Sequence, residues 1–240
     1  MRVEIWTDIV CPWCGLGYHR LEQALARFGH EGEVELVHRS FQLDESARVG
    51  VTERVRDMLK SKLGLSDTQV VDMTRRIEQM AQADGLTPYN VLKNRVGNTS
   101  LAHEFAAWAT ELGKGKEVWR LLYKTYFAEA RSIFDVDSLA PLATQLGLDA
   151  TAAREAMTSR RYAGKVIADG REARSLGSGG VPFVVIDRKY GVSGAQPVEV
   201  LLEALETAWR EKNPQKLVSV AGQSDAGICG PDGCEVPERP

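Results

Sequence analysis

Two closely spaced cysteines near the start of the chain are the residues best suited to chemistry. Cys11 and Cys14 flank a Pro-Trp dipeptide in the stretch "DIVCPWCGLG". Two thiols at this spacing can act as a redox pair, or they can supply half of a zinc site. Zinc would need two further ligands, which the two remaining cysteines or a histidine could provide. A third interpretation is a pair of inert buried thiols.

The elements around this pair favour redox chemistry. The alternation of residues 3–7 predicts a strand, and the apolar spacing of residues 13–28 predicts an amphipathic helix that ends at "GHEG". A second strand is predicted over residues 34–43, which gives the order strand, helix, parallel strand. The cysteines therefore stand where the first strand passes into the helix, whereas structural zinc ligands usually lie on turns.

This position at the start of a helix assigns a role to each cysteine. Unpaired N–H groups and the positive end of the helix dipole favour thiolate over thiol there. Cys11 lies near the predicted helix cap, and Cys14 lies within the first turn. We therefore predict that Cys11 is the attacking thiol and that Cys14 resolves the mixed disulfide.

The rest of the chain divides into a helical block and a second α/β segment. Residues 52–176 show helical patterns separated by glycines, the first opening at Thr52 as a cap. After "GSGG", "PFVVID" predicts a buried strand and "YGVSG" a short partner strand after a turn at Arg188-Lys189. Residues 196–213 predict a final helix. An α/β core split by a helical insertion explains this order, with both halves completing one sheet.

Pro182 stands directly before the predicted strand of the second α/β segment. A proline would be awkward within a central strand, so it indicates a turn, and a cis peptide is one form of such a turn. Gly179 and Gly180 precede it and fit a close approach of two backbones. An ordinary loop proline is the alternative that these residues leave open.

Cys229 and Cys234 lie in a tail, residues 214–240, that is rich in Gly, Pro, Ser and Asp. They enclose Gly-Pro-Asp-Gly, a strong turn sequence, which would bring the two cysteines close enough for a disulfide. We predict a second redox pair that exchanges with the first. A metal-binding or vestigial tail is the alternative.

Composition argues against nucleic-acid and membrane partners. The chain has 240 residues, is 43% hydrophobic and carries a formal net charge of -3, so it lacks the basic field that nucleic acids require. Its longest apolar run, "VPFVVI", is far too short to span a membrane. The N-terminus also lacks the pattern of a signal peptide, and we therefore expect a cytoplasmic protein.

The motifs in combination resemble a known family. "CPWC" after the first strand, a long helical insertion, "GVPF" and "VSGAQP" resemble the DsbA family of thioredoxin-fold oxidoreductases, and within it the FrnE-like branch. The resemblance covers about residues 2–213. It implies an α/β thioredoxin domain over residues 1–213 with an inserted all-helical subdomain at about 44–177, followed by a flexible tail. It also implies that Pro182 is a cis proline facing the disulfide of Cys11 and Cys14.

Two related groups resemble the same scaffold and supply an alternative. Kappa-class glutathione transferases and 2-hydroxychromene-2-carboxylate isomerases usually carry serine at the nucleophile position and use glutathione, whereas this chain has Cys11 there and a second cysteine after it. We therefore predict a protein disulfide oxidoreductase or isomerase that needs no cofactor. A glutathione-dependent isomerase or transferase and a zinc-binding module using the four cysteines are the alternatives.

The predicted partners are protein or peptide thiols and disulfides, with glutathione as a further candidate. The predicted site contains the two cysteines, the proline and their neighbours: Cys11, Cys14 and Pro182 as catalytic residues, with Pro12, Trp13 and Val181 in contact with the substrate. Trp13 can equally serve to shield Cys14. His38, on the second predicted strand, and His103, in the helical insertion, are interpreted as structural.

Overall fold

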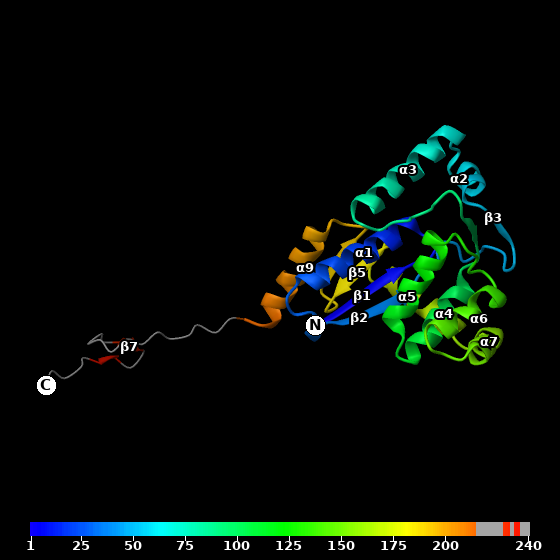
Figure 1. The fold of residues 1–240 in the computed structure, drawn as a ribbon. Helices are drawn as coiled ribbons and strands as arrows, with labels where there is room; N and C mark the ends of the chain where they lie inside the picture. The colour runs from blue at the N-terminus through cyan, green and yellow to red at the C-terminus, as the bar shows by residue number, and fades with distance from the viewer. Residues whose placement is uncertain (215–227, 231–232, 236–240) are drawn as a thin grey trace.

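A mixed sheet of four strands, ordered β2-β1-β5-β6, forms the centre of this computed structural model (Figure 1). The structure describes residues 1–214, 228–230 and 233–235. β1 (Arg2–Thr7) pairs in parallel with β2 (Glu35–Ser40) and antiparallel with β5 (Phe183–Ile186), which pairs with β6 (Tyr190–Ser193). The parallel pair and the single sheet completed by both halves of the chain are as the sequence predicted.

Helices cover both faces of this sheet. α1 (Pro12–Arg27) and α9 (Val198–Lys212) pack side by side on one face, and α8 (Ala163–Ser175) packs against β1 and β2 on the other. The alternation within β1 explains the layers, because Ile5 joins the core shared with α1 whereas Trp6 joins a smaller cluster with Ala173 of α8. The expected insertion over residues 44–177 thus includes a helix that completes the sheet's second layer.

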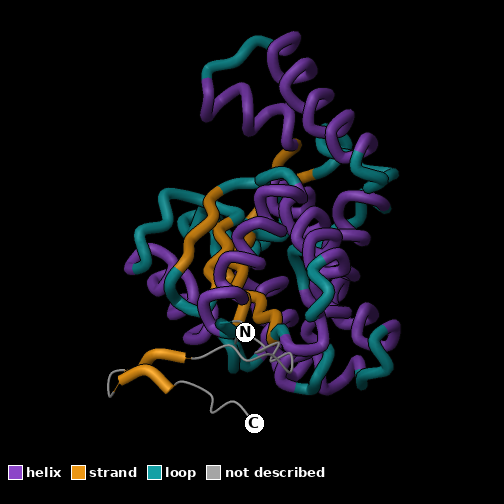
Figure 2. The backbone as a smooth tube through the Cα atoms, turned by 90° about the vertical axis from the view of Figure 1, so that its left-hand side faces the viewer, coloured by secondary structure: helices purple, strands orange, loops and turns teal. Residues whose placement is uncertain are grey.

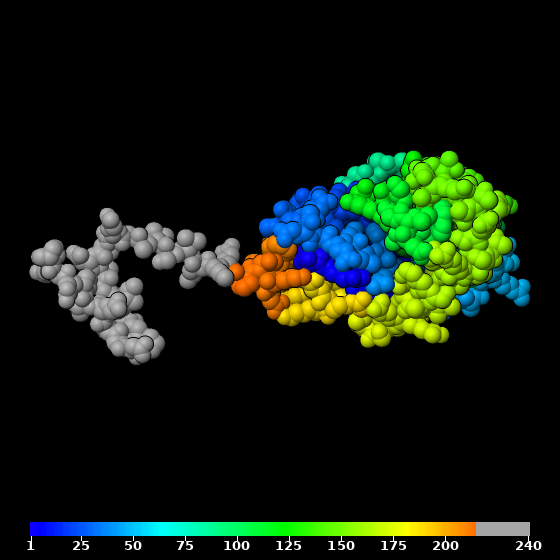
Figure 3. Space-filling model, turned by 90° about the horizontal axis from the view of Figure 1, so that it is seen from below, coloured from blue at the N-terminus to red at the C-terminus, as the bar shows by residue number. Residues whose placement is uncertain are grey.

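The remaining helices come after β2 and before α8 along the chain. They are α2 (Val55–Leu63), α3 (Asp67–Ala83), α4 (Ser100–Glu111), α5 (Gly115–Tyr123), α6 (Val136–Gln145) and α7 (Ala150–Thr158), with a π-helical turn at Lys124–Ala128 and a short 3₁₀ turn at Glu31–Glu33 earlier in the chain. The α2–α3 pair projects at the top of Figures 1 and 2. α5 packs against β2, and in Figure 3 the green part of the insertion accordingly lies against the blue N-terminal part of the chain.

The insertion is not wholly helical, which corrects one prediction. Thr52 does not cap a helix but begins β3 (Thr52–Arg54), which pairs antiparallel with β4 (Arg95–Gly97). The Arg95 guanidinium donates to the Thr52 side chain and carbonyl at 2.8 and 2.6 Å, and these distant partners outweigh the local helical pattern. α2 therefore begins two residues later than predicted, at Val55, with Arg54 instead of Thr52 as its cap.

Two further parts of the chain refine the predictions. Lys189 N donates to the Ile186 carbonyl at 3.0 Å, which centres the β5–β6 turn on Asp187 and Arg188, one residue earlier than predicted. In the tail, β7 (Ile228–Gly230) and β8 (Gly233–Glu235) form a two-stranded sheet of their own. Most of the tail predicted to be flexible, residues 214–240, lies outside the described residues. Among the described residues, no helix has the length and apolar character needed to cross a membrane.

Candidate active site

Cys11 and Cys14 occupy the positions in α1 that the sequence predicted. Cys11 is the N-cap, with extended backbone at φ -78 and ψ 115, and Pro12 follows at the start of the helix, where its missing N–H costs nothing. A turn closed by Cys11 N and the Asp8 carbonyl at 3.1 Å leads from β1 into this cap. Cys14 N and Gly15 N both donate to the Cys11 carbonyl, at 3.0 and 3.2 Å.

The two thiols are free, and their surroundings differ. Cys11 is 5% exposed and Cys14 is completely buried, so the sulfur predicted to attack is the one nearer the surface. Burial, followed by the hydrogen bond and charge of the neighbouring Cys11, raises the pKa of Cys14 well above its usual range. No acidic residue lies in the first turn of α1 to oppose a thiolate. Cys14 is therefore held as the neutral thiol near neutral pH.

Pro182 lies beside Cys11, and its peptide bond with Val181 is cis. The Cys11 Sγ is 3.9 Å from the Val181 carbonyl oxygen, and the Pro182 carbonyl accepts a hydrogen bond from Gly194 N at 2.8 Å. The Val181 N–H donates to no acceptor among the described residues. The two segments predicted to meet, at Cys11 and at Pro182, therefore do so.

The glycines that allow this approach are not the ones predicted. A Cβ at Gly179 or Gly180 would meet no other atom within 4 Å, so neither is required by a close contact. A Cβ at Gly17 of α1 would lie 2.8 Å from Cγ of Pro182. Gly17 is thus the residue whose small size lets the proline pack against the helix.

Trp13 points to the surface between the cysteines. Its side chain is 40% exposed, which favours contact with a substrate over shielding of Cys14. It borders a cavity of about 510 Å³ whose other lining residues all come from α3: Gln69, Asp72, Met73, Arg76, Ile77 and Met80. The insertion therefore supplies one wall of the space beside the "CPWC" motif.

Asp8 is a buried acid beside the motif whose role the sequence analysis missed. It is 1% exposed, and its Oδ1 lies 3.3 Å from Nε2 of His103, which is completely buried on α4. Its Oδ2 accepts the Leu43 N–H at 2.8 Å. The signal was present, because an acid directly after a buried strand needs partners, but the pairing with a histidine 95 residues away could not be read locally.

Tyr89 is a second missed residue. It follows α3, and its hydroxyl donates to the Pro12 carbonyl, between the two cysteines, at 2.5 Å. Nothing in the sequence around "TPYN" sets this tyrosine apart.

The tail cysteines occupy paired backbone positions in their own hairpin. The register pairs Cys229 with Cys234, as the turn sequence predicted, but residues 215–227 between this hairpin and α9 lie outside the described residues. For the zinc alternative, the described part of the chain contains no group of three or more His, Cys, Asp and Glu side chains placed to hold a metal ion.

Comparisons with known proteins identify the family. Residues 2–206 match the DSBA-like thioredoxin domain. A probable DsbA oxidoreductase of Streptomyces coelicolor, known from its crystal structure, is 44% identical, covers 99% of this chain and 100% of its own, and superposes with a TM-score of 0.85. The uncharacterized protein YwbO of Bacillus subtilis strain 168 is 28% identical over 162 residues, which are 68% of this chain and 74% of YwbO.

More distant solved structures share the fold. A 2-hydroxychromene-2-carboxylate isomerase is 18% identical, with 88% of this chain and 98% of that chain covered and a TM-score of 0.68. The cytosolic disulfide reductase DsbM of Pseudomonas aeruginosa, solved with GSH, is also 18% identical, with 88% and 100% covered and a TM-score of 0.59. From the family match and its 44% identical relative, the chain belongs to the DSBA-like thioredoxin domain family and is an enzyme with thiol–disulfide oxidoreductase activity.

Proposed function

We propose that Cys11 and Cys14 form the redox centre of this oxidoreductase, with Cys11 as the nucleophile. The observation that carries the proposal is the position of the Cys11 sulfur. It lies at the N-cap of α1, 3.9 Å from the carbonyl oxygen of the cis Val181–Pro182 peptide. A thiolate there gains from the free N–H groups of the helix start, and it is the sulfur nearer the surface.

The proposed reaction has two exchange steps. In the reducing direction, the Cys11 thiolate attacks a substrate disulfide, a mixed disulfide forms, and one substrate thiolate leaves. Cys14 then loses its proton to water or buffer and attacks the Cys11 sulfur, and the second substrate thiolate leaves. Two electrons pass from the dithiol to the substrate, and the oxidising direction is the reverse. Because the pKa of Cys14 is raised, the second step should accelerate as the pH rises above neutrality.

An extended peptide fits the surface beside Cys11. The Val181 N–H has no acceptor among the described residues, so it can pair with the backbone of an incoming chain as an added strand would. The exposed Trp13 and the cavity against α3 can then take a neighbouring substrate side chain. We propose protein or peptide disulfides as substrates, and glutathione as a small thiol partner, in the cytoplasm.

The tail hairpin is proposed as a second redox pair. Residues directly opposite in an antiparallel pair have Cα atoms about 4.5–5.5 Å apart, within the range that disulfides bridge. Cys229 and Cys234 are such a pair. Exchange with Cys11 would pass through a Cys11–Cys229 mixed disulfide. A variant carrying Cys14→Ser and Cys234→Ser should accumulate it, whereas a variant carrying Cys14→Ser and Cys229→Ser should not.

Two measurements test the roles of Cys11 and Cys14. Alkylation of the reduced protein with iodoacetamide at about pH 6 should modify Cys11 before Cys14. With an oxidised disulfide-containing peptide as the probe, Cys14→Ser should trap a mixed disulfide that peptide mass mapping places on Cys11, while Cys11→Ser traps none. Preferential modification of Cys14, or trapping on Cys14 in the Cys11→Ser variant, would reverse the assignment.

A further inference from the structure

Tyr89 reaches from the helical insertion into the redox motif. It lies in the segment between α3 and β4, 77 residues from the motif in sequence, and its hydroxyl donates to the Pro12 carbonyl at 2.5 Å. Pro12 stands between the two cysteines. This hydrogen bond therefore joins the insertion to the peptide unit that separates the attacking and resolving thiols.

The segment that carries Tyr89 is firmly anchored. Its ring stacks on Phe127, with centroids 4.4 Å apart. The next residue, Asn90, donates its backbone N–H and its side-chain amide to the Phe127 carbonyl at 2.8 and 3.0 Å. Val91 N donates to the Glu78 carboxylate at 2.7 Å. Because the Tyr89 ring and the backbone after it are both held, the Tyr89 hydroxyl can fix the position of the Pro12 carbonyl.

Gly15 of α1 provides the space for the Tyr89 hydroxyl. A Cβ at Gly15 would lie 2.4 Å from the hydroxyl oxygen, and 3.3 Å from Cε2 of both Tyr89 and Phe127. Any larger residue would have to displace the hydroxyl from the Pro12 carbonyl. The glycine directly after Cys14 is thus explained by this contact rather than by backbone conformation.

The hydroxyl stays protonated and therefore acts as a donor. Tyr89 is 8% exposed, and burial, followed by the charges of Cys11 and Cys14, raises its pKa well above the usual range.

We propose that Tyr89 is a positioning residue for the redox pair. Its hydrogen bond fixes the Pro12–Trp13 peptide and polarises it, so that the Trp13 N–H at the helix start becomes a better donor to the Cys11 thiolate. Stabilising this thiolate favours the reduced dithiol over the disulfide. The inference rests on the proposed roles of Cys11 and Cys14.

The first test compares Tyr89→Phe with a matched control, Tyr126→Phe. Tyr126 is also buried and donates to the Arg95 carbonyl at 2.8 Å, which is outside the motif. Each substitution removes one hydroxyl hydrogen bond, so both should lower the denaturation midpoint. Tyr89→Phe should also shift the equilibrium with reduced and oxidised glutathione about fivefold toward the Cys11–Cys14 disulfide, roughly 20 mV. It should slow alkylation of Cys11 at about pH 6 about threefold.

The second test uses the contact with Gly15. Gly15→Ala should displace the Tyr89 hydroxyl and shift the glutathione equilibrium in the same direction and by a similar factor as Tyr89→Phe. In the double variant the clash at 2.4 Å is gone, because phenylalanine lacks the oxygen. The double variant should therefore be more stable than Gly15→Ala alone, and its equilibrium should match that of Tyr89→Phe.

Two failures can be told apart. If the wild-type protein forms no Cys11–Cys14 disulfide in glutathione buffers, the proposed function is wrong, and the alkylation rates still decide whether Tyr89 affects Cys11. If the wild type equilibrates normally but Tyr89→Phe behaves as Tyr126→Phe does, with lower stability and unchanged equilibrium and alkylation, Tyr89 is structural and the inference is overturned.

Discussion

His38 and Arg39 are neighbours on β2, yet the two faces of the sheet bury them in opposite ways. His38 lies under α1 and α5, where its ring meets Tyr18 at 4.6 Å and stacks on Trp119 at 5.1 Å. Its Nε2 has no hydrogen-bond partner within the described part of the chain. Arg39 lies on the face covered by α8, where it donates to Glu4 at 2.7 Å and to Asp169 at 3.2 Å.

The two environments have opposite effects on charge. Burial, followed by the charges of Arg120 and Lys116, lowers the pKa of His38 to about 3, so the imidazole is neutral in the folded protein. For Arg39, burial opposes the charge, but the hydrogen bond to Glu4 and the two carboxylates outweigh it and raise its pKa. On one face the buried His38 is kept neutral, and on the other face the charge of the partly buried Arg39 is paired with carboxylates.

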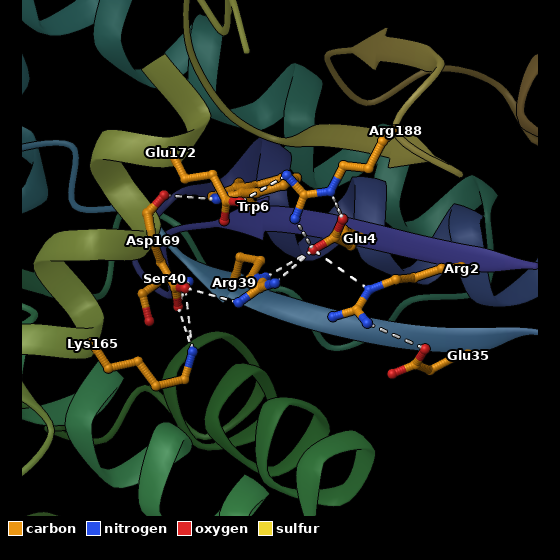
Figure 4. A network of polar contacts seen from close by, with 10 residues as sticks. All are labelled: Arg2, Glu4, Trp6, Glu35, Arg39, Ser40, Lys165, Asp169, Glu172 and Arg188. Atoms are coloured by element: carbon orange, nitrogen blue, oxygen red, sulfur yellow. Dashed lines mark hydrogen bonds and ion pairs between the residues drawn. The ribbon is translucent and has the colours of Figure 1, made fainter. Parts of the chain in front are cut away.

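The paired face holds a connected network (Figure 4). Glu4, 1% exposed, is contacted by three arginines, Arg2, Arg39 and Arg188, and the buried Asp169 is bonded to Lys165 and to Ser40 N as well as to Arg39. Cys11 and Cys14 belong to the core cluster on the opposite face of the sheet. We propose a separation of roles: the network stabilises the fold, whereas the proposed redox chemistry of Cys11 and Cys14 takes place on the other face.

The largest effect expected at neutral pH is the loss of Arg39. Arg39→Met leaves Asp169 and Glu4 buried with one cation fewer, which should lower the free energy of unfolding by about 3 kcal/mol. The urea midpoint measures this loss. The thiol–disulfide equilibrium of Cys11 and Cys14 with glutathione should stay within twofold of wild type.

The matched control is an ion pair at the surface. Arg27 contacts Glu199 at 3.1 Å with both side chains more than half exposed, so Arg27→Met should cost less than about 1 kcal/mol. A shift of the glutathione equilibrium in Arg39→Met comparable with that of Tyr89→Phe would contradict the separation of the two faces.

The next effect is acid sensitivity from His38. The folded state keeps this histidine neutral down to about pH 3, whereas the unfolded chain protonates it below about pH 6.5. The unfolded state therefore binds more protons between these values, and stability falls as the pH falls, by about 1.4 kcal/mol per unit. Its contribution is complete above about pH 6.5.

His38→Phe should flatten this dependence, because the aromatic stacking is kept and the titration is removed. Urea midpoints at several pH values between about 4 and 7 give the slope. His19→Gln provides the comparison, since His19 is partly exposed and bonds the Asp84 carbonyl at 2.9 Å. Equal slopes in His38→Phe and wild type would show that His38 is not the group responsible.

The sequence predicted well those features that depend on local patterns. The strand, cap and first helical turn around Cys11 are contiguous in the sequence, so their patterns can be read locally. The final α/β segment is likewise predicted by the apolar run that follows Pro182. The missed features depend on partners distant in sequence. β3 is a strand because β4 pairs with it, Tyr89 matters because Pro12 lies beside it, and Glu4 can be buried because Arg188 arrives from the other end of the chain. A prediction that a residue is buried does not identify which distant residue it contacts.

The smallest expected effect is at Arg188, where strain and charge oppose each other. Asp187 and Arg188 form the centre of the β5–β6 turn with φ of 46 and 57, both in the left-handed region. A turn whose two central residues are both left-handed favours glycine, and a non-glycine residue there costs about 1 kcal/mol. The guanidinium of Arg188 compensates by donating to Glu4 and Glu172, at 2.7 Å each.

Two substitutions at this position separate the contributions. Arg188→Ala loses the ion pairs but keeps the strained backbone, and because Arg188 is 40% exposed the loss should be about 1 kcal/mol. Arg188→Gly loses the same pairs but relieves the strain, so its free energy of unfolding should lie within about 0.5 kcal/mol of wild type. If glycine is as destabilising as alanine, the turn is not strained, and the network on the α8 face depends on Arg188 more than the exposure of its side chain indicates.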